Sequence, residues 1–312
     1  MESVLLTGSS GTVGVELGKR IIERGIELHG VDSVPNRWSE KIDEVSIEAD
    51  LTKNGSTEEL PTDVDMIIHF AANARVHKLV KDPVGAKENL DMTFNILEHA
   101  RKNNIQNIIF ASSREVYGNK GKMIYNEENT YVDECESPYT ASKVGGESMV
   151  KAYENCYDID SCILRFSNVY GKYDSSDRVI PLFIAQASTG QDLTVYGSQK
   201  VLDFTYIEDC VDGILKTIEN FDKVKDTTIN IASGKGSSIM ELAELVTQQT
   251  NKDVNINVEQ TRTGEVSRYV ADISKAKKII GYEPTYDLSD GINETVSWYN
   301  ENEYLFDEIL TS

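Results

Sequence analysis

The chain has 312 residues, of which 39% are hydrophobic, and it carries a formal net charge of −21 at pH 7. This length can bury a substantial core, and the acidic balance disfavours a nucleic-acid partner because such binding depends on clustered Lys and Arg. No apolar run approaches the ~18 residues that a membrane span needs, and the N-terminus lacks the basic region of a signal peptide. We therefore expect a cytoplasmic globular protein that binds neither nucleic acid nor a membrane.

Short apolar runs alternate with helical periodicity through the first half of the chain. The run at 3–8 ends in a glycine, the segment 12–25 has the spacing of an amphipathic helix, and the next run, 27–32, ends in an aspartate. The same alternation continues to about residue 170. It predicts an α/β fold in which a doubly wound parallel sheet is covered by helices on both faces.

The rhythm changes after residue 170, where a polar loop and shorter elements follow. We expect residues 1–170, joined by 206–233, to form a dinucleotide-binding domain, and 171–312 to form a smaller, interleaved substrate-binding domain. No Cys-X-X-Cys or Cys/His spacing occurs, so neither a metal site nor a disulfide framework is predicted. The cysteines are Cys135, Cys156, Cys162 and Cys210.

A glycine-rich turn separates the first predicted strand from the first helix. Its sequence TGSSGTVG places Gly8, Gly11 and Gly14 where backbone N–H groups and a helix N-terminus can approach a pyrophosphate. Asp32 closes the second strand, where a carboxylate accepts hydrogen bonds from an adenosine ribose and repels a 2′-phosphate. NAD is therefore favoured over NADP, although Arg37 follows closely. The alternative is a turn that only packs the helix onto a Rossmann sheet.

The segment YTASK contains a tyrosine and a lysine, Tyr139 and Lys143, four residues apart and so on one helix face. A neighbouring ammonium stabilises a phenolate and lowers the pKa of the phenol, and the positive nicotinamide ring of NAD acts in the same direction. Tyr139 could then serve as a general base. On most helices this spacing is an ordinary surface pair, but here it follows the fifth strand of a dinucleotide fold.

These motifs, in this order, resemble the extended short-chain dehydrogenase/reductase family of nucleotide-sugar epimerases and dehydratases. The resemblance covers essentially the whole chain and is more specific for the family than for the reaction. The segments that carry it are TGSSGTVG, Asp32, ADL at 49–51, HFAA at 69–72, Asn89, SSREVYG, YTASK, LRFSNVYG, RTGEVSRYVADISKAKKIIGYEP and GINETVSWY.

The resemblance implies bound NAD and a set of residues that hold it. Asp50 and Leu51 would hold the adenine, Ala71 and Ala72 would line the cofactor path, and Asn89 would support the helix that bears it. The full set implied for the cofactor is Gly8, Gly11, Thr12, Val13, Gly14, Asp32, Asp50, Leu51, Phe70, Ala71, Ala72, Asn89, Tyr139 and Lys143.

The same resemblance implies a catalytic set of Ser113, Tyr139 and Lys143, with Glu115 beside them. Ser113 would hydrogen-bond the sugar hydroxyl that is oxidised, and the bulk of Tyr269 would limit room beside the C2 substituent. The residues expected to bind a nucleotide-sugar substrate are Ser113, Asn168, Arg178, Val195, Tyr196, Lys200, Arg262 and Tyr269.

Two departures from the family pattern affect the substrate site. Leu202 stands where an arginine usually contacts the substrate phosphates, and we expect Arg178 or Lys200 to supply the missing cation. The second departure is Arg114, which stands where dehydratases have aspartate, so their two-carboxylate pattern is broken although Glu115 remains.

Arg114 and Glu115 allow two arrangements. They could form a surface ion pair, which contributes ~1 kcal/mol or less, or their side chains could diverge. Neighbouring residues at an extended strand end point to opposite sides, so we expect divergence, with Ser113 and Glu115 both facing the nicotinamide. Glu115 would then position the sugar.

We expect an NAD-dependent 4-epimerase that acts on UDP-glucose and UDP-galactose through a 4-keto intermediate. The alternatives are a nucleotide-sugar 4,6-dehydratase or a UDP-glucuronate decarboxylase, because Glu115 is shared with those lyases. A non-catalytic NAD-binding sensor is a further alternative, although such proteins commonly lack the tyrosine or the lysine. The family also implies a homodimer.

Overall fold

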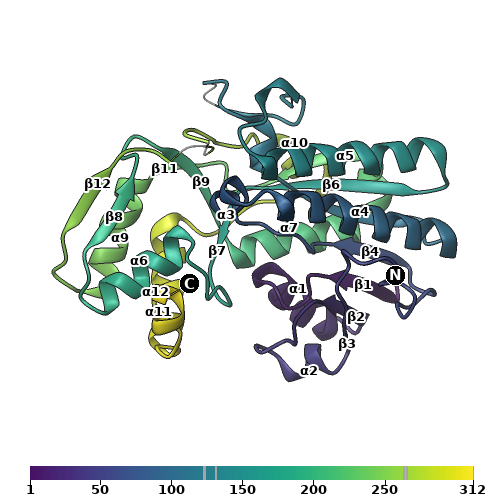
Figure 1. The fold of residues 1–312 in the computed structure, drawn as a ribbon, viewed down its shortest axis with the longest axis horizontal. Coiled ribbons are helices and arrows are strands. Elements are labelled where there is room, and N and C mark those ends of the chain that lie inside the picture. Colours follow the sequence, from purple (N-terminus) through teal and green to yellow (C-terminus); the bar gives the residue numbers. More distant parts are fainter. Residues whose placement is uncertain (122–123, 131, 263, 265, 312) are drawn as a thin grey trace.

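The structure is a computed structural model that describes residues 1–121, 124–130, 132–262, 264 and 266–311. A seven-stranded, fully parallel sheet with the order β3-β2-β1-β4-β5-β6-β10 forms the larger lobe (Figure 1). The predicted doubly wound sheet is confirmed, and its order reverses between β1 and β4, where such sheets leave a ligand crevice. The strands are β1 (Ser3–Thr7), β2 (Glu27–Asp32), β3 (Ser46–Glu48), β4 (Met66–His69), β5 (Asn107–Ser113), β6 (Asp160–Phe166) and β10 (Thr227–Ile231).

Helices cover both faces of this sheet because successive residues of its strands are buried on opposite sides. On β1, Leu5 packs with α4 and α5, whereas Val4 and Leu6 pack with α1 and α7. Both faces are therefore apolar, as expected for a parallel sheet. The helices of this lobe are α1 (Thr12–Glu23), α2 (Glu40–Asp43), α3 (Val76–Lys81), α4 (Val84–Asn103), α5 (Pro138–Cys156), α7 (Ile207–Glu219), α8 (Phe221–Val224) and α10 (Ser274–Ile280), with 3₁₀ turns η1 (Arg114–Tyr117) and η2 (Val132–Glu134).

Helix α5 approaches its neighbours closely because two adjacent glycines face them. A Cβ on Gly146 would lie 2.6 Å from Cζ of Phe110 on β5, and a Cβ on Gly145 would lie 2.9 Å from Cδ2 of Leu90 on α4. The side chain of Ser137 caps the helix by accepting a hydrogen bond from the Thr140 amide at 3.1 Å. This packing brings the first turn of α5 to the carboxyl end of β5.

The smaller lobe consists of two short sheets covered by helices, on the left of Figure 1. Between β9 and β11 the chain returns to the larger lobe, where α7 packs beside α1 and β10 pairs with β6. The proposed domains are residues 1–170 with 206–233, and the remainder of 171–312, although β7 pairs with β9 of the smaller lobe and α10 packs on β10, α7 and α8 of the larger one. The elements of the smaller lobe are β7 (Asn168–Tyr170), β8 (Leu193–Tyr196), β9 (Val201–Tyr206), β11 (Gly236–Ser238), β12 (Ile256–Glu259), α6 (Val179–Ser188), α9 (Ile239–Thr250), α11 (Leu288–Asn300) and α12 (Leu305–Thr311).

Candidate active site

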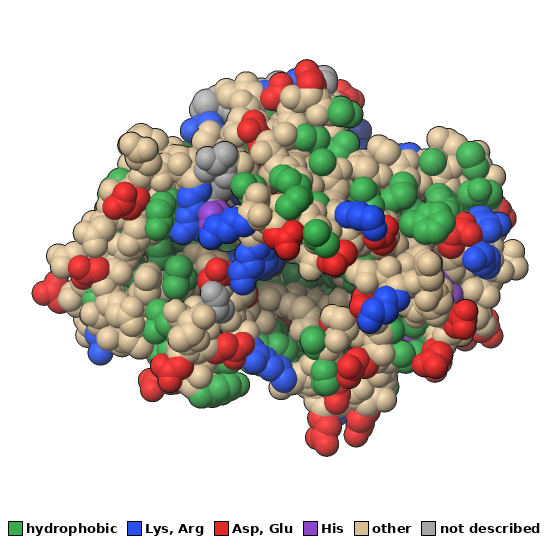
Figure 2. Space-filling model, viewed as in Figure 1, with side chains coloured by type: hydrophobic (Ala, Val, Ile, Leu, Met, Phe, Trp, Pro, Cys, Tyr) green, Lys and Arg blue, Asp and Glu red, His purple; other side chains and the backbone are tan. Residues whose placement is uncertain are grey.

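A cavity of about 620 Å³ lies where the carboxyl ends of β1, β4 and β5 meet the smaller lobe. Figure 2 shows a hollow near the middle of the molecule with Lys and Arg side chains at its rim. Although the whole chain is strongly acidic, the lining of this cavity is rich in cationic side chains, so the cavity is suited to an anionic ligand. Its basic residues are Arg75, Lys78, Arg114, Lys143, Arg178, Lys200 and Arg262, and its acidic residues are Glu115, Asp174 and Asp177.

The glycine turn lies at one end of this cavity. Gly8 has φ +75°, and its carbonyl oxygen accepts a hydrogen bond from the Gly11 amide at 3.1 Å. A Cβ on Gly14 would lie 2.0 Å from that same carbonyl oxygen. Only glycine allows this close approach. Thr12, Val13 and Gly14 line the cavity, so the first turn of α1 faces it, and a helix N-terminus in this place fits a dinucleotide pyrophosphate.

Asp32 is held at the edge of the glycine turn. Its carboxylate accepts hydrogen bonds from the amides of Ser10 at 2.9 Å and Ser33 at 2.8 Å. Arg37 turns away from it: the guanidinium donates to Glu308 on α12 at 2.8 Å and lies 4.4 Å from the centre of the Trp38 ring. Arg37 is thus engaged with the smaller lobe, and its nearness in sequence to Asp32 does not make a 2′-phosphate site.

The other residues predicted to hold the cofactor divide into two groups. Phe70 and Ala72 line the cavity. Asp50, Leu51 and Ala71 are not part of its lining. Leu51 is buried in the core, and hydrogen bonds led by that from Thr52 lower the pKa of Asp50 to about 2. The amide of Ala71 donates to the Thr7 hydroxyl at 3.1 Å.

Asn89 acts through other residues rather than by lining the cavity. Its side-chain oxygen accepts from the Asn73 amide at 2.7 Å, and its nitrogen donates to the Ser142 hydroxyl at 3.0 Å. It therefore ties the loop after β4 to helix α5, one turn from Tyr139.

Tyr139 and Lys143 lie in the first turns of α5, and both side chains are buried. The Lys143 ammonium donates to the carbonyl of Ala111 on β5 at 2.8 Å and lies 5.9 Å from the centre of the Tyr139 ring. The Ser113 hydroxyl lies close enough to the Tyr139 phenol to act as a hydrogen-bond partner that lowers its pKa. The structure thus brings Ser113, Tyr139 and Lys143 together at one wall of the cavity.

Burial is the main influence on both ionisable groups. Burial, and after it the Glu115 charge, raise the pKa of the Tyr139 phenol, while the Ser113 hydroxyl and the charges of Arg178 and Arg114 oppose this rise. Burial lowers the pKa of Lys143 to about 8. Deprotonation of the phenol at neutral pH therefore depends on positive charge close to it.

Arg114 and Glu115 do not diverge, so that expectation was wrong. Strand β5 ends at Ser113, whose hydroxyl accepts from the Glu115 amide at 3.2 Å and caps the turn η1. In a 3₁₀ turn neighbouring residues no longer point to opposite sides, and Arg114 donates to Glu115 at 2.9 Å. The Glu115 side chain is only 5% exposed, so this is a buried ion pair and not a surface one. The Arg114 Nε also donates to the Asn168 side chain at 3.1 Å.

The residues predicted to bind the substrate are mostly found in the cavity. Arg262 stacks on the ring of Tyr196 at 3.9 Å, and Arg178 pairs with Asp174 at 3.6 Å. Asn168 and Lys200 line the cavity beside Leu202, whereas Val195 is buried in the core.

Tyr269 lies outside the lining of the cavity. Its ring is fully buried and stacks on Tyr117 and Tyr125 at 5.6 and 5.8 Å. The structure therefore places this side chain in an aromatic cluster of the core, and its predicted effect at C2 could reach a sugar only through neighbouring residues.

Sequence reasoning missed one ion pair of the cavity wall. Arg75, which precedes α3, donates to Asp177 in the loop before α6, and so joins the two lobes. The available signal was a basic residue in the segment between β4 and α3, beyond the carboxyl end of a sheet strand. In the described residues we find no group of side chains suited to hold a metal ion and no helix long and apolar enough to cross a membrane.

A model of the NAD dependent epimerase/dehydratase family matches residues 4–232. The chain belongs to this family. A putative UDP-glucose 4-epimerase of Methanocaldococcus jannaschii is 32% identical, with 96% of this chain and 99% of that protein covered. A UDP-N-acetyl-alpha-D-glucosaminuronate decarboxylase of Bacillus cytotoxicus is 30% identical, with 96% and 98% covered.

Among solved structures, the UDP-glucuronic acid 4-epimerase of Bacillus cereus, in complex with UDP-glucuronic acid and NAD, is similar. It superposes with a TM-score of 0.88 and is 26% identical, with 96% of this chain and 99% of that chain covered. The cofactor of this epimerase/dehydratase family member is therefore NAD, and the fit of the glycine turn agrees. The relatives differ in the reaction that they catalyse.

Substituting Gly14 tests the cofactor site. We expect Gly14→Ala to weaken NAD binding and to lower the free energy of unfolding by ~1 to 3 kcal/mol, because its Cβ would displace the Gly8 backbone. Gly25→Ala is the control. It imposes backbone strain because Gly25 has φ +73°, but a Cβ there meets nothing within 4 Å. Calorimetric titration with NAD should show a defect in Gly14→Ala alone; equal NAD affinities would contradict the assignment.

Proposed function

We propose that the protein is an NAD-dependent nucleotide-sugar 4-epimerase, with UDP-glucose and UDP-galactose as substrates. The observation that carries this proposal is the meeting of Ser113, Tyr139 and Lys143 at a cation-rich cavity, beside a Glu115 that is held by Arg114. A hydroxyl, a phenol and an ammonium suit proton removal from a sugar alcohol, and the cations suit a diphosphate.

In this proposal the phenol of Tyr139 removes the proton from the C4 hydroxyl, and Ser113 orients that hydroxyl. The chemistry that bound NAD supplies is reversible hydride exchange with C4. Lys143 stays largely charged at neutral pH, because its pKa is about 8, and favours the phenolate. The 4-keto sugar then turns, so that hydride and proton return on the opposite face.

The smaller lobe would anchor the nucleotide while the sugar turns. The Arg262 guanidinium lies over the Tyr196 ring, and Lys200 also lines the cavity. An arginine fixed in this way can bind a phosphate through two N–H groups without a large loss of side-chain freedom. Tight binding of the nucleotide with looser contacts to the sugar suits an epimerase.

A lyase is the second candidate, because Glu115 is present and a relative is named as a decarboxylase. The buried ion pair argues for the epimerase: Arg114 occupies one oxygen of Glu115 and stabilises its charged form, and the position of a second carboxylate is taken by a guanidinium. Dehydration at C6 requires an acid as well as a base, and only one carboxyl group is present in this pair.

The proposal also includes a homodimer in the cytoplasm. The exposed ring of Phe94 on α4, which packs beside α5, is compatible with a two-helix dimer face.

Tyr139→Phe tests the assigned general base. We expect at least a ~10²-fold loss of interconversion of UDP-glucose and UDP-galactose, because the group that removes the C4 proton is gone. NAD content and the fold should be retained. Products should be followed by NMR, with UDP-glucuronate and UDP-N-acetylglucosamine as parallel substrates; near-normal turnover in the variant would rule out this mechanism.

Arg178→Ala and Lys200→Ala test how the loss of an arginine at Leu202 is compensated. Removing a charged hydrogen-bond donor from a phosphate typically costs ~1.5 to 3 kcal/mol, so at least one variant should raise the substrate Kd roughly 10-fold or more. Lys223→Ala, which removes a charge outside the cavity, is the control. If neither variant differs from this control, the compensation hypothesis is wrong.

Glu115→Gln separates the epimerase from the lyase. It leaves Arg114 buried without its counter-charge, which typically costs about 3 to 5 kcal/mol, so we expect a lower free energy of unfolding. The double variant Arg114→Met, Glu115→Gln removes both charges and should recover stability. Glu115→Gln should reduce epimerase activity by much less than the ~10²-fold expected for loss of a general base. A 4-keto-6-deoxy product or carbon dioxide from the unmutated protein, lost on Glu115→Gln, would favour the lyase.

A further inference from the structure

We call residues 171–178, which join β7 to α6, the bridging segment. Its side chains that line the cavity are Asp174, Ser176, Asp177 and Arg178. Three parts of the larger lobe, which follow β1, β2 and β4, donate hydrogen bonds to this segment. The pairs are Thr12 to the carbonyl of Tyr173 at 3.2 Å, Arg37 to the hydroxyl of Ser175, and Arg75 to the carboxylate of Asp177. The cofactor side of the cavity therefore holds a segment of its substrate side.

Tyr173 has an uncommon backbone conformation that several contacts hold in place. Its φ of +66° lies in the left-handed region, which bulky side chains rarely adopt. The Lys19 ammonium on α1 donates to its hydroxyl at 2.8 Å. Its ring packs against the rings of Trp38 and Trp298, with centroid distances of 5.8 and 5.6 Å. Such a conformation persists only where the surroundings determine it, so these contacts fix the direction of the chain after Tyr173.

The direction of the chain after Tyr173 decides where Asp174 and Arg178 lie. The carbonyl of Asp174 accepts from the Tyr299 hydroxyl on α11, and its carboxylate lies 3.6 Å from the Arg178 guanidinium. The Asp174 side chain is only 5% exposed, whereas that of Arg178 is 39% exposed at the cavity. The guanidinium of Arg178 therefore takes its place from Asp174, which takes its own from the turn at Tyr173.

We propose that Tyr173 is a positioning residue that fixes Arg178 in the substrate site by anchoring the bridging segment to the cofactor helix α1. The proposal rests on the proposed function in so far as Arg178 contacts the substrate phosphates. Tyr173 itself is outside the lining of the cavity, so it acts on the substrate through Asp174 and Arg178. A cation whose position is set in advance loses less side-chain freedom when it binds a phosphate.

Steady-state kinetics of Tyr173→Ala test the proposal. The variant loses the contacts with Lys19 and both tryptophans, so Arg178 is no longer held, and loss of one charge-assisted contact to a phosphate should raise KM for UDP-galactose about 10-fold. The value of kcat should change little, because the catalytic residues on β5 and α5 are untouched. Tyr173→Phe keeps the ring and should restore most of the affinity. A fall in kcat with KM unchanged would overturn the proposal.

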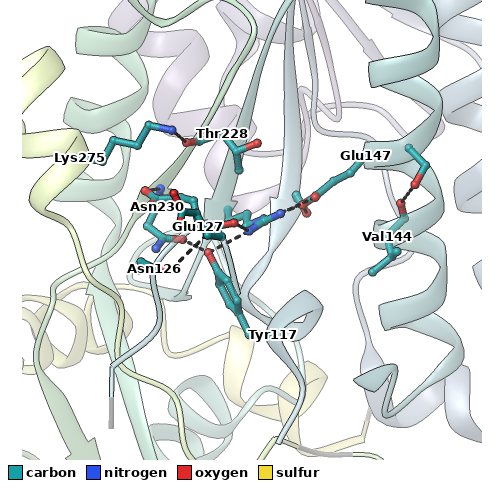
Figure 3. A network of polar contacts seen from close by, with 12 residues as sticks. Tyr117, Asn126, Glu127, Val144, Glu147, Thr228, Asn230 and Lys275 are labelled. Atoms are coloured by element: carbon teal, nitrogen blue, oxygen red, sulfur yellow. Dashed lines mark hydrogen bonds and ion pairs between the residues drawn. The ribbon is translucent and has the colours of Figure 1, made fainter. Parts of the chain in front are cut away.

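Lys19→Met keeps the proposal testable if Tyr173→Ala does not fold. It removes the donor to the Tyr173 hydroxyl, so KM should rise by the same modest factor as in Tyr173→Phe. The two changes together should add nothing further, because both remove one hydrogen bond. Lys275→Met is the matched control, since Lys275 donates to the Thr228 carbonyl at 2.7 Å and does not line the cavity (Figure 3). A KM for Lys19→Met equal to that of this control would overturn the proposal.

Tryptophan fluorescence reports on the bridging segment without turnover. The chain has two tryptophans, Trp38 and Trp298, which both pack on Tyr173 and do not line the cavity. Titration of the NAD-loaded protein with UDP should change their emission through the bridging segment, and Tyr173→Ala should abolish this change at saturating UDP. Equal responses in the two proteins would overturn the proposal. Failure of the unmutated protein to convert any nucleotide sugar would contradict the proposed function alone, because this titration needs no turnover.

Discussion

The hydrogen bond between the Lys143 ammonium and the Ala111 carbonyl fixes helix α5 against strand β5, and the arrangement of the cavity depends on it. The helix can come this close because Gly145 and Gly146 present no side chain to Leu90 and Phe110. The first turn of α5 then meets the end of β5, where Ser113 reaches Tyr139. A shift of the helix by one residue would rotate the Tyr139 and Lys143 side chains by ~100° away from the cavity.

The charge of the cavity differs from that of the whole molecule. A net charge of −21 would repel a nucleotide diphosphate at long range, but this repulsion is screened within ~8 to 10 Å at moderate ionic strength. Inside the cavity the nearest charges dominate, and these include Arg114, Arg178 and Arg262. Affinity for an anion is therefore a local property of this site, and composition alone excluded only extended anionic partners such as nucleic acid.

The parts that could be predicted from sequence depend on spacing within one element. The glycine turn and the Tyr139–Lys143 pair were placed in the cavity by motif alone, because a turn or a helix fixes which residues share a face. Arg114 and Glu115 were misplaced because nothing local signals that a 3₁₀ turn begins directly after β5 ends at Ser113.

Tyr269 was drawn into the core by contacts from distant parts of the chain. Its partners Tyr117 and Tyr125 lie more than a hundred residues earlier, so neither periodicity nor spacing could place its ring.

Contacts between distant residues also divide the cations of the cavity into two kinds. Arg114, Arg178 and Arg75 each pair with a carboxylate, so an incoming phosphate must compete with an anion already bound. Arg262 instead lies on the Tyr196 ring, a contact that orients the guanidinium without neutralising it. In the proposed reaction the diphosphate would therefore bind most tightly on the smaller lobe, and the sugar would meet the neutralised pairs beside Tyr139, where it is left free to turn.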